Sequence, residues 1–146
     1  MTKVVATSKV LIVNEKDDLL ILKIGVHTQQ PERSHTLDLP GGFVDNGESE
    51  RDGAAREIKE ETDIDIDGRD LVLVWSETNY YEDQDTSVTH MIYLIKLDHT
   101  PNVVISWEHE SYEWVPLTET TDRFEDKPRF KKVTDYVRRH DLLLRT

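Results

Sequence analysis

The chain lacks cysteine and has no long hydrophobic run. Without cysteine it can form no disulfide and carry out no thiol chemistry, although this absence does not fix the cellular compartment. No segment approaches the roughly 18 consecutive apolar residues that suggest a membrane span. The apolar stretch near the N-terminus is too short and too interrupted for a signal peptide. We therefore expect a cytoplasmic protein with no membrane partner.

Basic residues are also scarce. The 146 residues include 18 Lys and Arg against 30 Asp and Glu, which gives a formal net charge of −12. A protein that binds nucleic-acid backbones needs a basic surface, so a nucleic-acid partner is not expected. An anionic membrane is disfavoured for the same reason. If the ligand is itself anionic, a bound cation must mediate the contact.

Hydrophobic residues make up only 36% of the chain, but they are grouped into distinct runs, which is typical of a globular protein. A single domain over residues 1–146 is the expectation for this length. Strands are predicted at 4–13, 19–24, 71–75, 88–97 and 112–115, with helices at 49–62 and 130–144. Residues 37–44 are predicted to be extended but broken by Pro40-Gly41-Gly42. The segment NEKDD between the first two strands predicts a hairpin turn. This order favours a mixed sheet covered by helices, an α/β or α+β sandwich.

The first predicted helix carries an unusual concentration of negative charge. At about 100° per residue, Glu57, Glu60 and Glu61 fall on one face, beside the apolar side formed by Ala54 and Ile58. Like charges three or four residues apart destabilise a helix by roughly 0.2–0.5 kcal/mol per pair. A glycine within the helix, Gly53, costs about 1 kcal/mol more relative to alanine.

A local cost without a local benefit suggests a functional role. Three carboxylates at this spacing can reach one oxygen-ligated divalent cation, or two neighbouring ones, and a cation would remove their repulsion. Gly53 would leave space for the cluster. The alternative is an ordinary solvated acidic face, because charged residues make up 33% of the chain. The Pro-Gly-Gly turn before the helix is also weak evidence on its own.

Taken together, these features resemble the signature of the Nudix hydrolases. That signature is written G-x5-E-x7-R-E-U-x-E-E-x-G-U, where U is an aliphatic residue. The chain matches from Gly42 to Ile64, with Glu48, Arg56, Glu57, Glu60 and Glu61 at the fixed positions. The single departure is Asp63, which replaces the last glycine. Because Asp tolerates a left-handed backbone better than most residues, we expect a slightly strained turn and an intact site.

The resemblance implies a Nudix-type α/β/α sandwich and a metal-dependent pyrophosphohydrolase. The family generally cleaves the diphosphate bridge of a nucleoside diphosphate linked to another moiety. By position, Glu57, Glu60, Glu61 and the backbone carbonyl of Gly41 would bind Mg²⁺ or Mn²⁺. Arg56 would orient the carboxylates, with Glu48 as a partner. The alternative for Arg56 is an ordinary helix ion pair with Glu60.

The residue types suit this chemistry. Metal ions neutralise a diphosphate and lower the pKa of a bound water, and a glutamate then removes the proton. Glu57 or Glu61 is placed for this role. Some members of the family draw the base from a later loop, where Glu108 is the first candidate and Glu110 the second. Both could equally be solvated loop acids.

The sequence is less informative about the substrate. Several aromatic residues could stack on a base, although core packing is the commoner role: Phe43, Trp75, Tyr80, Tyr81 and Trp107. A polar loop with His27, Arg33 and His35 could contact phosphate or be simply solvated. We expect a small nucleotide substrate, with a homodimer left open. Two alternatives are a nucleotide sensor without turnover and a pyrophosphohydrolase of RNA 5′ ends, for which Arg138, Arg139 and His140 form the only basic cluster.

Overall fold

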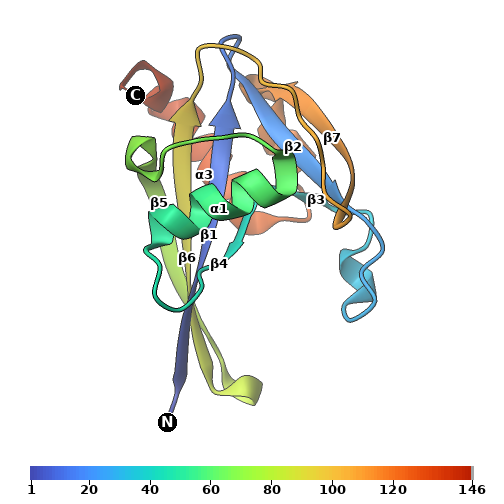
Figure 1. Ribbon diagram of the computed structural model, residues 1–146, viewed down its shortest axis with the longest axis vertical. Helices are drawn as coiled ribbons and strands as arrows, with labels where there is room; N and C mark the ends of the chain where they lie inside the picture. Colours follow the sequence, from blue (N-terminus) through green and yellow to red (C-terminus); the bar gives the residue numbers. More distant parts are fainter. Residues whose placement is uncertain (146) are drawn as a thin grey trace.

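The computed structural model describes residues 1–145 and shows a mixed β-sheet with helices on both faces (Figure 1). Its seven strands are β1 (Lys3–Val13), β2 (Asp18–Ile24), β3 (Leu37–Asp38), β4 (Gly41–Phe43), β5 (Val72–Tyr81), β6 (Thr86–Lys96) and β7 (His109–Pro116). The helices are α1 (Glu50–Thr62), α2 (Leu117–Arg123) and α3 (Pro128–Arg139). Short 3-10 turns occupy Pro31–Arg33, Gly68–Asp70, Glu82–Gln84 and Leu142–Arg145. The expected α/β/α sandwich is confirmed.

Strand β1 organises the sheet. It pairs in parallel with β6 along its whole length, and antiparallel with β2 and β4. Strand β2 pairs with β3 and β7, and β5 lies at the other edge beside β6. The pairing of β1 with β4 sets Lys9 opposite Gly41. A basic side chain of the central strand is thus brought to the glycine turn that precedes α1.

Two separate hydrophobic cores explain why the central strands are apolar on both faces. In β1, Val10 and Ile12 pack on the side of α1, with Ala54 and Ile58. Leu11 and Val13 pack on the other side, under α2 and α3. Phe124, just after α2, and Phe130, Val133 and Val137 of α3 complete that second core. The sheet is therefore held between the helices by apolar contacts on both faces.

Most predicted strands are present, and the hairpin at NEKDD is confirmed. The side chain of Asn14 accepts hydrogen bonds from the backbone N–H groups of Lys16 and Asp18, which fixes the turn. Strand β5 is longer than predicted, because it continues through Tyr81 and forms with β6 a long hairpin that extends beyond the body of the sheet (Figure 1). Strand β7 is also longer than predicted, beginning at His109 rather than at Tyr112.

The prediction for the C-terminal region was wrong in its details. Helix α3 begins at Pro128 and ends at Arg139, not at residue 144, and Asp141 just beyond it has a left-handed backbone that breaks the helix. Helix α2, starting directly after Pro116, was not predicted, since its sequence LTETTDR has little apolar periodicity. Within residues 1–145 the structure has no helix that is both long and apolar enough to cross a membrane.

Helix α1 begins and ends close to the predicted residues. Ser49 is the N-cap, and its hydroxyl accepts a hydrogen bond from the backbone N–H of Asp52 (3.1 Å). At the other end Asp63 has φ of 61° and ψ of 20°, the left-handed conformation expected at the position where the signature has glycine. Its carboxylate also forms an ion pair with Lys59 (2.8 Å). The departure from the signature thus leaves the helix end intact.

The turn at Asp63 gives a test of stability. Replacing Asp63 with alanine should lower the free energy of unfolding by about 1 kcal/mol, because alanine gains nothing locally to offset the left-handed backbone. Replacing it with glycine should change stability by no more than about 0.5 kcal/mol, because glycine relieves the strain but loses the exposed ion pair and gains freedom in the unfolded chain. Urea denaturation measures both changes. Equal effects of the two substitutions would contradict this account.

Candidate active site

Two glycines make room for carboxylates next to α1. A Cβ atom at Gly42 would lie 2.9 Å from the carboxyl carbon of Glu57, and one at Gly53 would lie 2.8 Å from Oε1 of Glu48. Both contacts are shorter than real Cβ contacts. The space that the sequence suggested for Gly53 is therefore real, but the carboxylate that occupies it belongs to Glu48. Neither glycine can be replaced without moving an acidic side chain.

Arg56 connects the acidic groups. Its guanidinium donates two hydrogen bonds to Glu48, from Nε to Oε2 (3.1 Å) and from Nη2 to Oε1 (2.9 Å). Its Nη1 also donates to Oε1 of Glu57 (3.3 Å) and to Oε1 of Glu60 (3.2 Å). Arg56 is thus more than a partner of Glu60, because one planar group spans three carboxylates and fixes their relative positions.

The three glutamates of the acidic face differ in burial. Glu61 is only 3% exposed, and its Oε1 accepts a hydrogen bond from the backbone N–H of Gly41 (2.9 Å). Glu57 is half-buried and Glu60 is exposed. All three line one cavity of about 610 Å³, together with Gly41 and Gly42. The three carboxylates predicted as metal ligands therefore lie on one wall of this cavity, with Glu61 buried, Glu57 half-buried and Glu60 exposed.

Burial disfavours the ionised form of two of these carboxyl groups, Glu61 and Glu57. Burial, followed by the charges of Asp38 and Glu57, raises the pKa of Glu61 to about 8. Burial also raises the pKa of Glu57, with added repulsion from Glu60 and Glu108. By contrast, hydrogen bonds from Arg56 lower the pKa of Glu48. A divalent cation would stabilise the ionised form of the two groups whose pKa values are raised, Glu57 and Glu61.

A buried charged network lies behind Glu61. The Lys9 ammonium donates to Asp38 (3.0 Å) and to the backbone carbonyls of Leu39 and Gly41 (3.1 and 3.0 Å). Nε2 of His109 lies 3.3 Å from Asp38 and 3.5 Å from Glu61. Burial alone would raise the pKa of Asp38, but Lys9 and His109 hold it well below its usual range.

None of Lys9, Asp38 and His109 was identified from the sequence. The only local signal is a lysine within the apolar run of β1, which is unusual for a buried strand. Ligand atoms of Asp38, Glu61 and His109 lie within 4.8 Å of one another, a spacing that could also hold a metal ion. Lys9 already supplies a cation to Asp38, however, so the charge of Asp38 is compensated as it stands. Because the Gly41 carbonyl has a second lone pair, its bond to Lys9 leaves room for another ligand.

The two later acids have different surroundings. Glu108 is exposed, lines the large cavity and also lines a neighbouring one of about 340 Å³. It is close enough to Glu57 to influence the pKa of that group. Glu110 instead pairs with His35 and does not line either cavity. Of the two candidates for an outer base, the structure therefore brings only Glu108 to the site.

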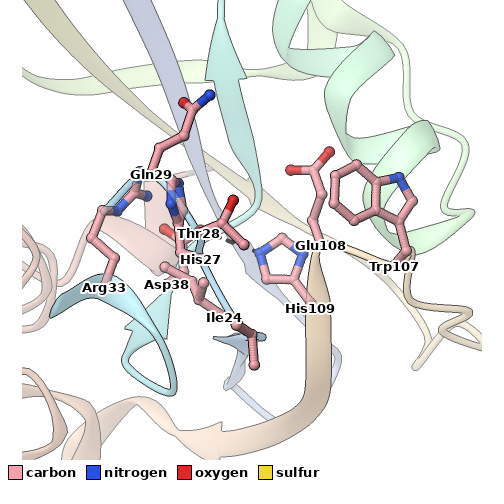
Figure 2. A pocket seen from close by; sticks show the side chains of 10 residues that line it. Ile24, His27, Thr28, Gln29, Arg33, Asp38, Trp107, Glu108 and His109 are labelled. Atoms are coloured by element: carbon pink, nitrogen blue, oxygen red, sulfur yellow. Dashed lines mark hydrogen bonds and ion pairs between the residues drawn. The ribbon is translucent and has the colours of Figure 1, made fainter. Parts of the chain in front are cut away.

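Figure 2 shows the smaller cavity from close by. Glu108 and His109 lie on one side with Trp107 beyond them, and Arg33, Gln29 and Thr28 lie on the other. The two cavities share Arg33, Asp38 and Glu108 in their walls. A ligand larger than the scissile group could therefore extend from the carboxylates towards this second space.

The aromatic candidates divide into two groups. Phe43 and Tyr81 line the large cavity, and Trp107, which is 90% exposed, lines the smaller one. Trp75 instead packs edge-on against Tyr136, and the hydroxyl of Tyr80 donates to Asp85. In the polar loop His27 and Arg33 line a cavity, whereas His35 does not.

Comparison with known proteins supports the resemblance that the sequence signature suggested. The NUDIX domain model matches residues 3–137. The chain belongs to the Nudix hydrolase family. As a Nudix hydrolase it acts on pyrophosphate bonds, and the expected family and enzyme class are confirmed.

Individual relatives share less than a third of the aligned residues with this chain. A Caenorhabditis elegans bis(5′-nucleosyl)-tetraphosphatase (asymmetrical) is 31% identical over 109 residues, which cover 75% of this chain and 72% of the worm protein. Among solved structures, the MutT protein of Methanosarcina mazei Go1 superposes with a TM-score of 0.77 at 27% identity, covering 96% of each chain. A binary complex of a C. elegans Ap4A hydrolase superposes with a TM-score of 0.70 at 26% identity, covering 96% of this chain and 97% of the worm protein.

The raised pKa of Glu61 predicts an unusual pH dependence of stability for the metal-free Nudix domain. The folded chain keeps a proton on Glu61 up to about pH 8, whereas the unfolded chain loses it near the ordinary value of 4.5. Between these values the unfolded state binds fewer protons, so this contribution to stability falls as pH rises. In EDTA, raising the pH from about 5 to about 8 should lower the melting temperature of wild type relative to Glu61→Gln. Parallel melting curves would contradict the assignment of a buried, protonated Glu61.

Proposed function

We propose that this Nudix hydrolase is metal-dependent and cleaves the diphosphate bridge of a nucleoside diphosphate linked to another moiety. Mg²⁺ or Mn²⁺ would be held by Glu57, Glu60, Glu61 and the backbone carbonyl of Gly41. The observation that carries the proposal is the gathering of these groups on one wall of a cavity large enough for a nucleotide.

The residues present fit such an ion. All the proposed ligands are oxygen atoms, which Mg²⁺ and Mn²⁺ prefer. The carboxyl groups of Glu57 and Glu61 have raised pKa values because burial and like charges are incompletely compensated there, and a cation would supply the missing charge. When bound, the metal neutralises the diphosphate and makes a bound water more acidic.

The chain's own residues would position the reaction and accept its proton. Arg56 holds Glu57 and Glu60 in place through its bonds to Glu48, as a positioning residue. We assign the general base to Glu57, because its Oε2 accepts no hydrogen bond among residues 1–145 and is free to take a proton. Water attacks one phosphorus as Glu57 takes its proton, the bridging P–O bond breaks, and the leaving phosphate keeps the electron pair. Glu108 is the second candidate.

A nucleotide substrate with a second moiety suits the paired cavities. The phosphates would lie along the carboxylate wall, and Phe43, Tyr81 or Trp107 would contact a base. The similarity to the worm tetraphosphatase favours dinucleoside polyphosphates within this class. We place the protein in the cytoplasm and leave a homodimer open.

The two alternatives from the sequence receive less support. A sensor without turnover would be expected to lose signature carboxylates, whereas here all four are retained and Arg56 joins three of them, Glu48, Glu57 and Glu60. For an RNA 5′-end enzyme the basic cluster should be free to bind phosphate. Instead Arg138 and Arg139 both pair with Asp135 (2.9 and 3.2 Å), and the ring of His140 lies against Tyr136.

The test of the proposed function is phosphate release from a panel of nucleotides. The panel contains nucleoside triphosphates, ADP-ribose, sugar nucleotides and diadenosine polyphosphates, each with Mg²⁺ or Mn²⁺ and with a phosphatase that exposes monophosphate products. We expect turnover of at least one dinucleotide or nucleoside diphosphate derivative, abolished by EDTA and lowered about 100-fold or more by Glu60→Gln.

Glu119→Gln is the matched control, because Glu119 is an exposed acid of α2 outside both cavities. It should turn over substrate at the wild-type rate. Absence of turnover with metal and nucleotide binding intact would favour the sensor. Turnover that EDTA leaves unchanged would refute the metal-dependent mechanism.

Arg56→Lys tests the positioning role. Lysine keeps the positive charge but cannot bond to three carboxylates with one planar group. We therefore expect Mn²⁺ affinity or kcat to fall by about 10- to 100-fold, with little change in melting temperature. Calorimetric Mn²⁺ titration and steady-state kinetics measure the two effects. Wild-type values for both would show that charge alone suffices at this position.

A further inference from the structure

The large cavity also has a cationic wall that the proposed metal site does not use. Lys127 comes just before α3, Arg129 lies in the first turn of α3, and His90 lies on β6. These groups reach the cavity from outside the signature, and the glutamates reach it from α1. In a chain with a net charge of −12, basic groups gathered around an acidic site require an explanation.

The environment of the Lys127 side chain is the central observation. It is half-buried, and among residues 1–145 no carboxylate lies within ion-pair distance of its ammonium. Burial lowers the pKa of Lys127, and the nearby Arg33 and Lys9 lower it further against the attraction of Asp38 and Asp126. Lys9, by contrast, is paired with Asp38. Partial burial of an ammonium group without a counter-ion costs free energy. An anion bound beside Lys127 would therefore stabilise the site.

The neighbours of Lys127 are fixed and have hydrogen-bonding capacity to spare. Arg129 forms an ion pair with Glu77 of β5, but its buried Nε, 3.5 Å from Oε2, makes no hydrogen bond with the described residues. Nδ1 of His90 lies 2.9 Å from the Thr7 hydroxyl, while its Nε2 is buried and has no partner among the described residues. Three nitrogen-bearing side chains from two elements therefore border the same space, each with an unused donor or acceptor.

We propose that Lys127, together with Arg129 and His90, binds a phosphate group of the substrate other than the two joined by the scissile bridge. This subsite rests on the proposed function, since the metal ligands would hold the scissile diphosphate itself. It would make the enzyme prefer substrates with three or more consecutive phosphates over those with two, such as ADP-ribose or sugar nucleotides. Without such cations, each added phosphate would be repelled by the acidic protein.

The test compares two substrates that differ in phosphate number, diadenosine tetraphosphate and ADP-ribose. Lys127→Met keeps the length and apolar part of the side chain and removes the charge. We expect it to raise KM for the tetraphosphate about 10- to 100-fold, as expected for loss of a charge-assisted contact, with less than about a two-fold change for ADP-ribose and similar kcat for both. Lys132→Met, an exposed lysine of α3 outside the cavity, is the matched control and should change neither.

Unchanged KM values in Lys127→Met, or equal increases for both substrates, would overturn the subsite. A second measurement does not depend on turnover: calorimetric titration with inorganic tripolyphosphate in EDTA. Wild type and Lys132→Met should bind it about 10-fold more tightly than Lys127→Met, and equal affinities would also overturn the subsite. If wild type turned over no member of the nucleotide panel yet bound tripolyphosphate through Lys127, the proposed function would fail while the anion subsite stood.

Discussion

The structure depends on the neutralisation of negative charge at the edge of a buried core. Glu61 is almost fully buried and Glu57 half-buried, next to the apolar side of α1. Two basic side chains compensate part of this charge: Arg56 donates a hydrogen bond to Glu57 from within the helix, and the charge of Lys9 on the central strand acts on Glu61. Their compensation is incomplete, as the raised pKa values of Glu57 and Glu61 show. The remaining need for positive charge supports our proposal that a divalent cation binds at this site.

Each layer of the fold contributes to that arrangement. Strand β1 sets Lys9 opposite Gly41, and the glycine turn brings a backbone N–H to Glu61. Gly41 itself has φ of 130°, and a Cβ there would lie 2.0 Å from the backbone oxygen of Ser8. The close approach of β4 to β1 therefore requires glycine. The sheet thus fixes the position of the turn, and the turn fixes the most buried carboxylate.

The sequence predicted the parts of the site that lie within one continuous segment. Helix α1, the left-handed Asp63 and the contact of Arg56 with Glu48 all follow from spacing or from the signature. It did not reveal Lys9, Asp38, His109 or Lys127, because these residues come from separate elements and meet only through the packing of the sheet. Helix α2 was missed because it is short and polar, and the end of α3 because a single residue, Asp141, breaks an otherwise helical pattern.

Anomalous diffraction from crystals soaked in Mn²⁺ would show directly whether the carboxylates of α1 hold the catalytic cation that we propose. We expect a strong anomalous peak contacting Glu57, Glu60 or Glu61 on the wall of the large cavity, and this peak should be lost or markedly weakened in Glu60→Gln crystals. A peak confined to Asp38 and His109, or no peak near α1 at saturating Mn²⁺, would contradict it.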